Sequence, residues 1–188
     1  MKPRLLAATL LIALLAGAPA GAQGIWKEVV AKEQGFAISM PGDPDHQKQN
    51  VRSPAGPVSA HTYTFSRVGT VYSITAVEYP EGLIQPDAAD QTLRYTRDGM
   101  VKQMEARILA DKEIFLGGNP GREFQCQQKN GLYTRIRIYL VKNRMYEVIC
   151  ATAPENRQGG DVPRFLNSFR LLPEPAAPAG AAGAAGGR

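Results

Sequence analysis

Hydrophobic and polar residues alternate along much of the chain, most clearly between Lys129 and Cys150. In an extended strand this period of two places Arg135, Arg137 and Tyr139 on one face and isoleucine and leucine side chains on the other. The apolar face should pack on a core, so the segment predicts one strand of a half-buried sheet. The arginines form a candidate surface patch that could bind an anion, but stems packed over apolar surface also explain the pattern.

Further segments with this alternation are separated by turn residues. Gly69-Thr70 suits a two-residue hairpin turn with glycine in its first position. The segment 129–131 suits a three-residue loop with Gly131 in the left-handed conformation, and Lys142-Asn143 suits a two-residue loop. Consecutive strands should therefore pair antiparallel. The predicted strands are residues 26–30, 36–40, 47–52, 58–68, 71–79, 108–116, 122–128, 132–141 and 144–152.

Two segments have the period of an amphipathic helix. The first follows Pro86, with Asp87 as the expected N-cap, and the second has Asp161 as its expected N-cap and ends near Phe169. Each should cover part of the sheet with one apolar stripe. The stripe of the first helix is Ala89, Leu93, Thr96, Met100 and Met104.

The two ends of the chain differ in composition from the part between them. Residues 1–22 have a basic start, an apolar run and a small-residue cleavage pattern, which predicts a secretory signal peptide and a mature start at Gln23. The apolar run is shorter than the roughly 20 residues of a membrane-spanning helix, so we expect no membrane span after cleavage. Residues 173–188 are rich in Ala, Gly and Pro, which predicts a disordered tail. One domain, residues 23–172, remains between them.

The charge of the chain limits its partners. The formal net charge is +5, and removing the leader with Lys2 and Arg4 leaves 5 − 2 = +3. This small charge is scattered along an exported chain, so we expect no nucleic-acid partner. The expected location is periplasmic or secreted.

Residues typical of catalysis are few. The only histidines are His46 and His61, and no His or Cys spacing typical of a metal site occurs. Counting from the Gly69-Thr70 turn places His61 opposite Glu78, either as a structural polar pair or as an acid–base dyad with Tyr63 nearby. The structural pair is the simpler interpretation, so we assign no catalytic, cofactor-binding or metal residue.

The two cysteines, Cys126 and Cys150, lie on the strands that flank 132–141. An even number of cysteines in an exported protein favours a disulfide. Strands two apart are separated by about 10 Å, which exceeds the roughly 7 Å between Cα atoms that a disulfide spans. We therefore predict two separate, largely buried thiols.

Three stretches suggest a known family. The chain contains "GFAISMPGDP" (35–44), "LGGNPGREFQ" (116–125) and "VPRFLNSFRLL" (162–172), and with these it resembles the PsbP-like and DcrB-like group. The resemblance implies an α+β fold, an α/β/α sandwich with a central antiparallel sheet flanked by helices. It also implies an extracytoplasmic protein that assists an assembly or has no assigned role. We expect no cofactor, because the chain matches no cofactor-binding motif. The residues that match turn positions of the group are Gly35, Pro41, Gly118 and Gly121.

These observations favour a non-catalytic domain that binds a protein or envelope component. The alternative is a small-ligand-binding or hydrolytic domain that uses His61 and Glu78. A concave pocket around His61 would favour the alternative, whereas an exposed patch suffices for a binding domain.

Overall fold

The structure is a computed structural model that describes residues 25–53 and 56–173. The predicted signal peptide and nearly all of the predicted tail lie outside the described residues. The described chain is mainly antiparallel β-structure. Its strands are β1 (Lys27–Ala31), β2 (Phe36–Met40), β3 (Asp45–Ser53), β4 (Gly56–Arg67), β5 (Thr70–Glu78), β6 (Ala106–Leu116), β7 (Asn119–Gln128), β8 (Tyr133–Val141), β9 (Arg144–Thr152) and β10 (Arg170–Leu171). Its helices are η1 (Pro86–Ala88, 3-10), α1 (Ala89–Gln103), η2 (Pro154–Asn156, 3-10) and α2 (Asp161–Ser168).

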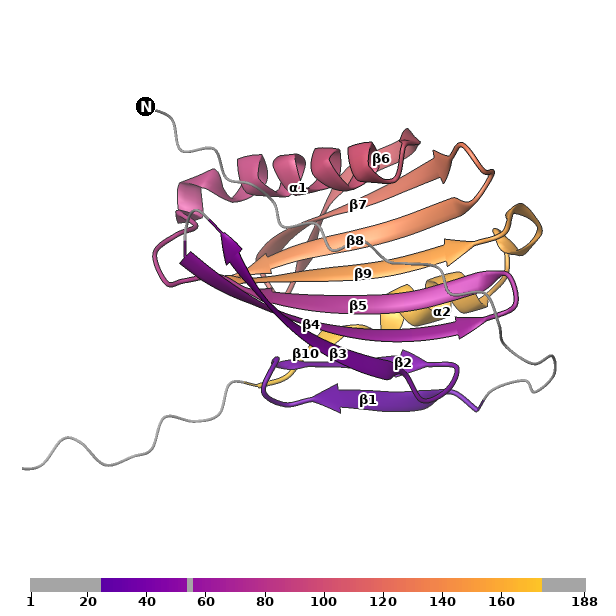
Figure 1. The fold of residues 1–188 in the computed structure, drawn as a ribbon, viewed down its shortest axis with the longest axis horizontal. Helices are drawn as coiled ribbons and strands as arrows, with labels where there is room; N and C mark the ends of the chain where they lie inside the picture. The colour runs from indigo at the N-terminus through magenta and orange to yellow at the C-terminus, as the bar shows by residue number, and fades with distance from the viewer. Residues whose placement is uncertain (1–24, 54–55, 174–188) are drawn as a thin grey trace, which may run out of the picture.

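Seven strands form the large sheet, in the order β3-β4-β5-β9-β8-β7-β6 (Figure 1). Hairpins join β3 to β5 and β6 to β9 in sequence, and the pairing of β5 with β9 joins these two halves. The predicted loops after β7 and β8 are confirmed, and Gly131 has a φ of +87°. The predicted register is confirmed with them, because Arg135 lies opposite Cys150 and Arg137 opposite Val148.

The predicted turn between β4 and β5 is wrong by one residue, so the pairing of β4 with β5 is shifted by two. Arg67 lies opposite Thr70, so the turn residues are Val68 and Gly69. Gly69 has a φ of +72°. Glycine therefore occupies the second central position, as in a type II turn, and not the first position that the prediction assumed.

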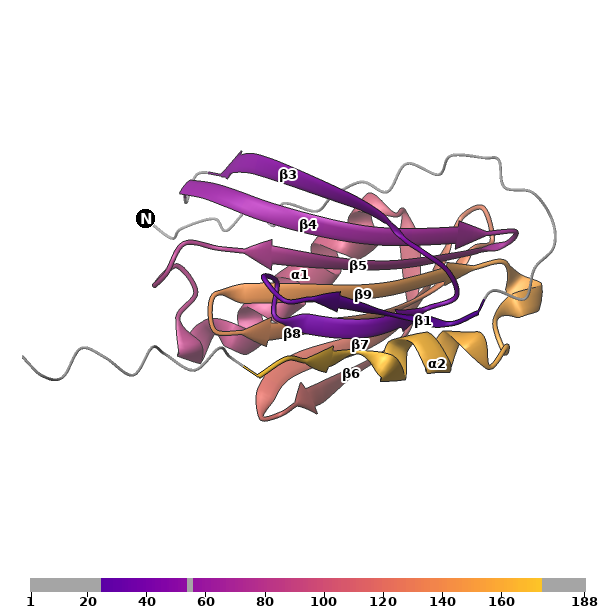
Figure 2. The ribbon, with the colours of Figure 1, turned by 90° about the horizontal axis from the view of Figure 1, so that it is seen from below.

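Different elements cover the two faces of the large sheet. A small sheet, in the order β1-β2-β10, and α2 cover one face, and α1 packs against β6, β7 and β8 on the other (Figure 2). The prediction of a single α+β domain with a central antiparallel sheet is confirmed. The hairpin of β1 and β2 is confirmed, but its separation from the large sheet and its third strand, β10, were not predicted. The small sheet occupies much of the face where a helical layer was expected.

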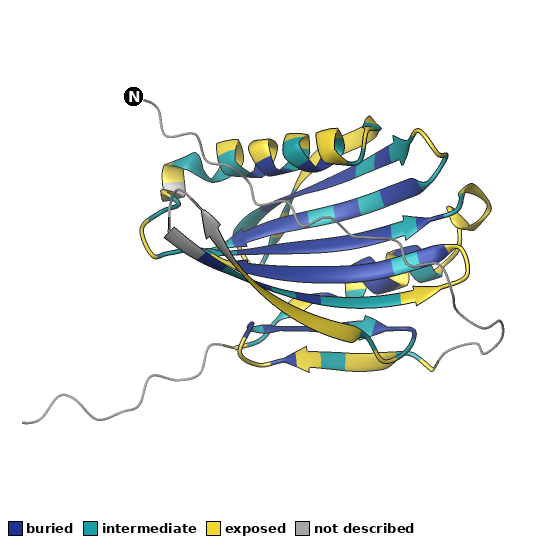
Figure 3. Cartoon of the chain, viewed as in Figure 1, coloured by how far each residue is buried: buried dark blue, intermediate teal, exposed yellow. Residues whose placement is uncertain are grey.

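The sheet therefore has a hydrophobic core on each side. On the α2 side, alternate residues of β5, β8 and β9 meet the small sheet and α2, and on the α1 side residues of β7 and β8 pack with the helix. Figure 3 shows that the central strands of the sheet are mostly buried. The most buried large side chains on the α2 side include Phe36, Ile38, Met40, Tyr72, Ile74, Phe165 and Leu166. On the α1 side they include Leu93, Phe124, Ile136, Ile138 and Met145.

Both predicted helix caps are wrong, although both helices are present. Ala88 and Gly160 occupy the N-cap positions, without a side-chain hydrogen bond. Asp161 is instead the first residue of α2 and forms an ion pair with Arg67. The predicted stripe of α1 is confirmed, since Leu93, Thr96 and Met100 are buried and Ala89 and Met104 are partly buried. No helix in the described ranges has the length and apolar character needed to cross a membrane.

The cysteines and Gly121 show how closely neighbouring strands constrain one another. Cys126 and Cys150 are buried, unpaired and on opposite faces of the sheet, as predicted.

Gly121 is not a turn residue, which corrects the prediction. It lies within β7, and a Cβ atom there would be 2.5 Å from the Ile138 carbonyl oxygen and 2.6 Å from a Tyr139 ring carbon.

β6 forms one edge of the large sheet. A β-bulge interrupts its pairing with β7 between Ile108 and Ala110. Beyond the bulge the strand carries Asp111, Lys112 and Glu113, and its apolar Phe115 is 70% exposed.

Candidate functional site

The predicted arginine patch binds a carboxylate of its own chain. Glu123 of β7 is only 3% exposed and accepts hydrogen bonds from Arg135 (2.7 Å) and Arg137 (2.6 Å). Burial alone would raise the pKa of Glu123, but the hydrogen bonds from the two arginines outweigh it and lower the pKa. Arg137 also donates to the Leu166 carbonyl and the Asn167 side chain, which ties β8 to α2.

Tyr139, the third member of the predicted patch, is not a surface residue. It is 4% exposed, and its ring stacks on Phe169 with 5.5 Å between ring centroids. The three residues therefore do not form an open anion site. Arg135 and Arg137 serve mainly to neutralise Glu123.

The predicted opposition of His61 and Glu78 is also wrong. The two-residue shift in register places His61 opposite Ala76 and Glu78 opposite Ser59. The Glu78 carboxylate instead accepts a hydrogen bond from Arg144 at 3.3 Å. The two side chains share a face of the sheet without contact, so the geometry of an acid–base dyad is absent from this pair.

His61 is paired with the other histidine. The Nδ1 atom of His61 lies 3.2 Å from Nε2 of His46, which stacks on the Tyr63 ring at 4.2 Å between centroids. Burial lowers the pKa of His61, and the positive charges of Lys48 and His46 act in the same direction. Among the described residues, His, Cys, Asp and Glu side chains form no group of three that could hold a metal ion.

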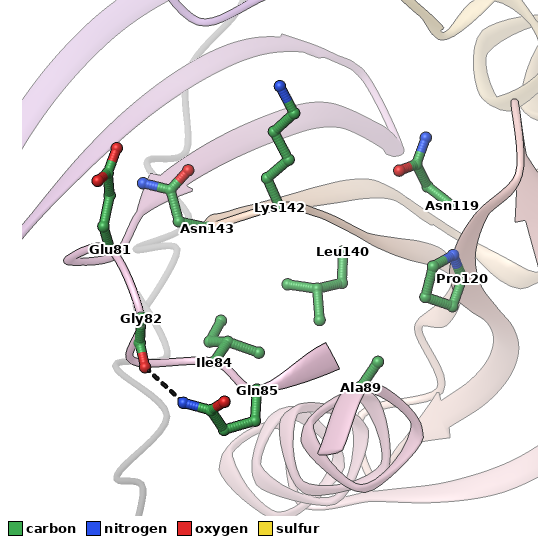
Figure 4. A pocket seen from close by; sticks show the side chains of 10 residues that line it. All are labelled: Glu81, Gly82, Ile84, Gln85, Ala89, Asn119, Pro120, Leu140, Lys142 and Asn143. Carbon is green, nitrogen blue, oxygen red and sulfur yellow. Dashed lines mark hydrogen bonds between the residues drawn. The ribbon is translucent and has the colours of Figure 1, made fainter. Parts of the chain in front are cut away.

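A pocket of about 400 Å³, which His61 does not line, lies between α1 and the ends of β7 and β8 (Figure 4). Its apolar side chains come from α1, β7, β8 and the loop before η1, and polar side chains surround them. We call it the loop pocket. It is lined by Glu81, Gly82, Ile84, Gln85, Ala89, Asn119, Pro120, Leu140, Lys142 and Asn143.

Hydrogen bonds fix the loops around this pocket. Asn143 donates from its side chain to the Tyr79 carbonyl at 2.9 Å, and its own carbonyl accepts from the Tyr79 N–H at 2.9 Å. Gln85 donates to the Gly82 carbonyl at 2.9 Å. Leu140 at the base is 4% exposed and belongs to the core on the α1 side. These contacts hold the walls of a half-open pocket whose volume suits a small ligand or a partner side chain.

An exposed aromatic residue lies beside the pocket. Phe115 of β6 pairs in register with Pro120, which lines the pocket. An aromatic ring that is 70% exposed beside a cavity is typical of a protein-binding surface.

Sequence reasoning missed the two buried glutamates and the loop pocket. The confirmed register of β7 and β8 already places Glu123 opposite Arg137. The alternation along β9 likewise places Glu147 on the face of Met145 and Ile149, so its burial was open to prediction. The pocket had no such signal, because its walls come from loops distant in sequence.

Comparison with known proteins supports the fold only. No family model and no curated protein matches the chain. The solution structure of cyanobacterial PsbP (CyanoP) from Synechocystis sp. PCC 6803 is similar at a TM-score of 0.55 and 10% identity, over 85% of this chain and 99% of that one. PA94, a protein of unknown function from Pseudomonas aeruginosa, gives a TM-score of 0.40 and 14% identity over 81% of this chain and 99% of its own. The similarity to CyanoP shows that the chain has a PsbP-like fold.

Proposed function

We propose that this PsbP-like chain is a non-catalytic, periplasmic or secreted domain that binds a protein or envelope component through the loop pocket. The single observation that carries the proposal is a half-open pocket with an apolar base, beside an exposed phenylalanine. Protein interfaces concentrate their binding energy in such an apolar pocket with a polar rim. The leader-like first 22 residues support the proposed location.

The partner should insert an apolar side chain over Leu140 and Ile84 while Phe115 packs on its surface. Glu81 and Lys142 provide charges of both signs at the rim, which would set orientation more than affinity. The hydrolytic alternative loses its main support, because the observed register separates His61 from Glu78.

A photo-crosslinking residue in place of Gln85 tests the proposal in the exporting cell. We expect a discrete adduct with one protein or envelope component. Ala89→Phe, which fills the pocket, should abolish the adduct, whereas Gln91→Phe on the exposed side of α1 should leave it unchanged. Absence of an adduct, or equal adducts in both variants, would contradict the proposal.

Intact mass of the exported protein checks the expected start at Gln23.

A further inference from the structure

One buried carboxyl group differs from the others in having no cation beside it. Glu147 of β9 is 5% exposed and lies between Thr75 of β5 and Ile138 of β8. Among the described residues, none forms a hydrogen bond or an ion pair with its carboxyl group. Burial raises the pKa of Glu147 from 4.5 to about 7. A buried ionised carboxyl without a partner is costly, so its presence needs an explanation.

The chain pairs its comparable carboxylates with arginine. Glu123 accepts from Arg135 and Arg137 on the opposite face. Asp111 on the same face as Glu147 pairs with Arg122 and Arg97. In this protein a guanidinium group is thus the usual partner of a buried or half-buried carboxylate on the sheet, and among the described buried glutamates Glu147 lacks one.

Hydroxyl groups lie beside Glu147 on the same face. Thr62 and Thr75 form a hydrogen bond of 3.0 Å between β4 and β5, and Thr64 and Ser73 form one of 3.1 Å. Because each pair is directly opposite in register, the hydroxyls form two short rows that lead toward β9. We call Thr62, Thr64, Ser73, Thr75 and Glu147 the polar half-face.

α1 lies over the other half of this face. It packs against β6, β7 and β8, and Figure 1 shows it along that end of the sheet, away from β4 and β5. Apolar Val77 and Ile149 border the polar half-face. The site thus offers one carboxylate, hydroxyl acceptors and a narrow apolar margin.

We propose that the polar half-face binds an arginine side chain of a partner polypeptide, with the guanidinium on the Glu147 carboxylate and the hydroxyl of Thr75 as a further acceptor. The charge of the arginine complements the unpaired carboxylate, its fork of donors matches a carboxylate with adjacent acceptors, and its apolar stem fits beside Val77 and Ile149. None of these residues lines the loop pocket, so this site is separate from the one in the proposed function.

The test is titration of the exported protein with N-acetyl-arginine-N-methylamide at pH 8, followed by amide NMR shifts. The uncharged citrulline analogue, which has nearly the same shape, is the ligand control. We expect shifts centred on Ser73, Thr75 and Glu147 with arginine and at least tenfold weaker binding of citrulline. Equal binding of the two probes, or shifts centred elsewhere, would overturn the proposal.

Variants separate a specific site from general attraction to acids. Glu147→Gln should weaken arginine binding at least tenfold, whereas Glu78→Gln, on the opposite face, should leave it unchanged. Thr75→Val, which keeps Glu147, should weaken it about threefold and serves if Glu147→Gln does not fold. Unchanged binding in both site variants would contradict the assignment.

Acidification provides a further readout. Binding should weaken from pH 8 to pH 6 as Glu147 takes up a proton. Tyr79 is the other titratable group that interacts with it, and burial raises the Tyr79 pKa, so that phenol stays neutral throughout. An affinity for the arginine amide that does not change with pH would contradict the role of the carboxylate.

A tetrapeptide with one arginine should bind more tightly than the single amide, and equal affinity would indicate a small arginine-like solute instead of a polypeptide.

Discussion

At the scale of single residues, the arginines of the sheet form ion pairs with carboxylates of the same chain. Arg137 shows this best, because it contacts Glu123, the Leu166 carbonyl and Asn167 at once, and its side chain is 17% exposed. The alternation along β8 predicts arginine stems packed over apolar surface with their charges at the surface. The structure instead makes them the partners of a buried acid.

Arg137→Ala should therefore lower the free energy of unfolding by about 3 kcal/mol, because it leaves Glu123 with one strong partner and frees the end of α2. Arg135→Ala should cost less, about 1 kcal/mol, since Arg137 remains. Urea unfolding at pH 7 measures both. Arg107→Ala, which removes an exposed hydrogen bond to Gln127, is the matched control and should have almost no effect. Equal losses in all three variants would show that Glu123 is not the cause.

Glu147 predicts a pH dependence of opposite sign to that of a paired carboxylate. Its folded pKa of about 7 lies above the ordinary 4.5, so the unfolded chain loses this proton first as pH rises. Glu147 should thus destabilise the fold increasingly between pH 4.5 and 7, by up to about 3 kcal/mol, and by a constant amount above that.

Comparison of Glu147→Gln with the unchanged protein in urea at pH 5 and pH 8 isolates this effect. The variant should be more stable than the unchanged protein at pH 8, and the difference should shrink at pH 5. A difference that does not vary with pH would mean that the carboxyl is solvated in the folded state.

At the scale of elements, β7 and β8 approach each other closely at Gly121. Gly121→Ala should lower the free energy of unfolding by about 2 kcal/mol, since its Cβ would press on the Ile138 carbonyl and the buried Tyr139 ring. Gly160→Ala is the control, because no atom lies within 4 Å of a Cβ there and its φ of −61° suits alanine. The midpoint of thermal unfolding should therefore be lower for Gly121→Ala than for Gly160→Ala. Equal midpoints would contradict this account.

Strand order also determines the state of the cysteines. Because β8 lies between β7 and β9, Cys126 and Cys150 cannot approach each other, and burial raises the pKa of the Cys126 thiol to about 11. Thiol counting with DTNB should find two free thiols per chain in denaturant without reductant, and very slow reaction of the folded protein. A monomer with no free thiol would exclude the order β7-β8-β9.

Local patterns predicted the hairpins well, because a turn and its two strands are close in sequence. The loops after Gln128 and Val141 fixed the register of three strands and with it the positions of both cysteines. The pairing of β5 with β9 and the two-residue strand β10 depend on contacts between distant segments, which no local period reports. The turn between β4 and β5 was predicted one residue too late, because glycine suits either central position of a tight turn.

At the scale of the whole molecule, one sheet separates two cores that share its strands. Phe165→Ala on the α2 side and Leu93→Ala on the α1 side should each cost about 3 kcal/mol, since both side chains are fully buried. Each should shift the far-UV and near-UV circular dichroism transitions together, because neither core persists without the sheet. Separate transitions in either variant would mean that the two layers unfold independently.

The bulge in β6 has a consequence for this sheet at high protein concentration. An open edge strand of eleven residues is a template on which another chain can add, and repeated addition leads to fibres. The bulge between Ile108 and Ala110 breaks the even spacing of backbone donors that an incoming strand would need. Asp111, Lys112 and Glu113 would also lose water on such a contact. The bulge and these three charges oppose growth of the sheet at β6, whose face is covered by α1 but whose outer edge is not paired with another strand.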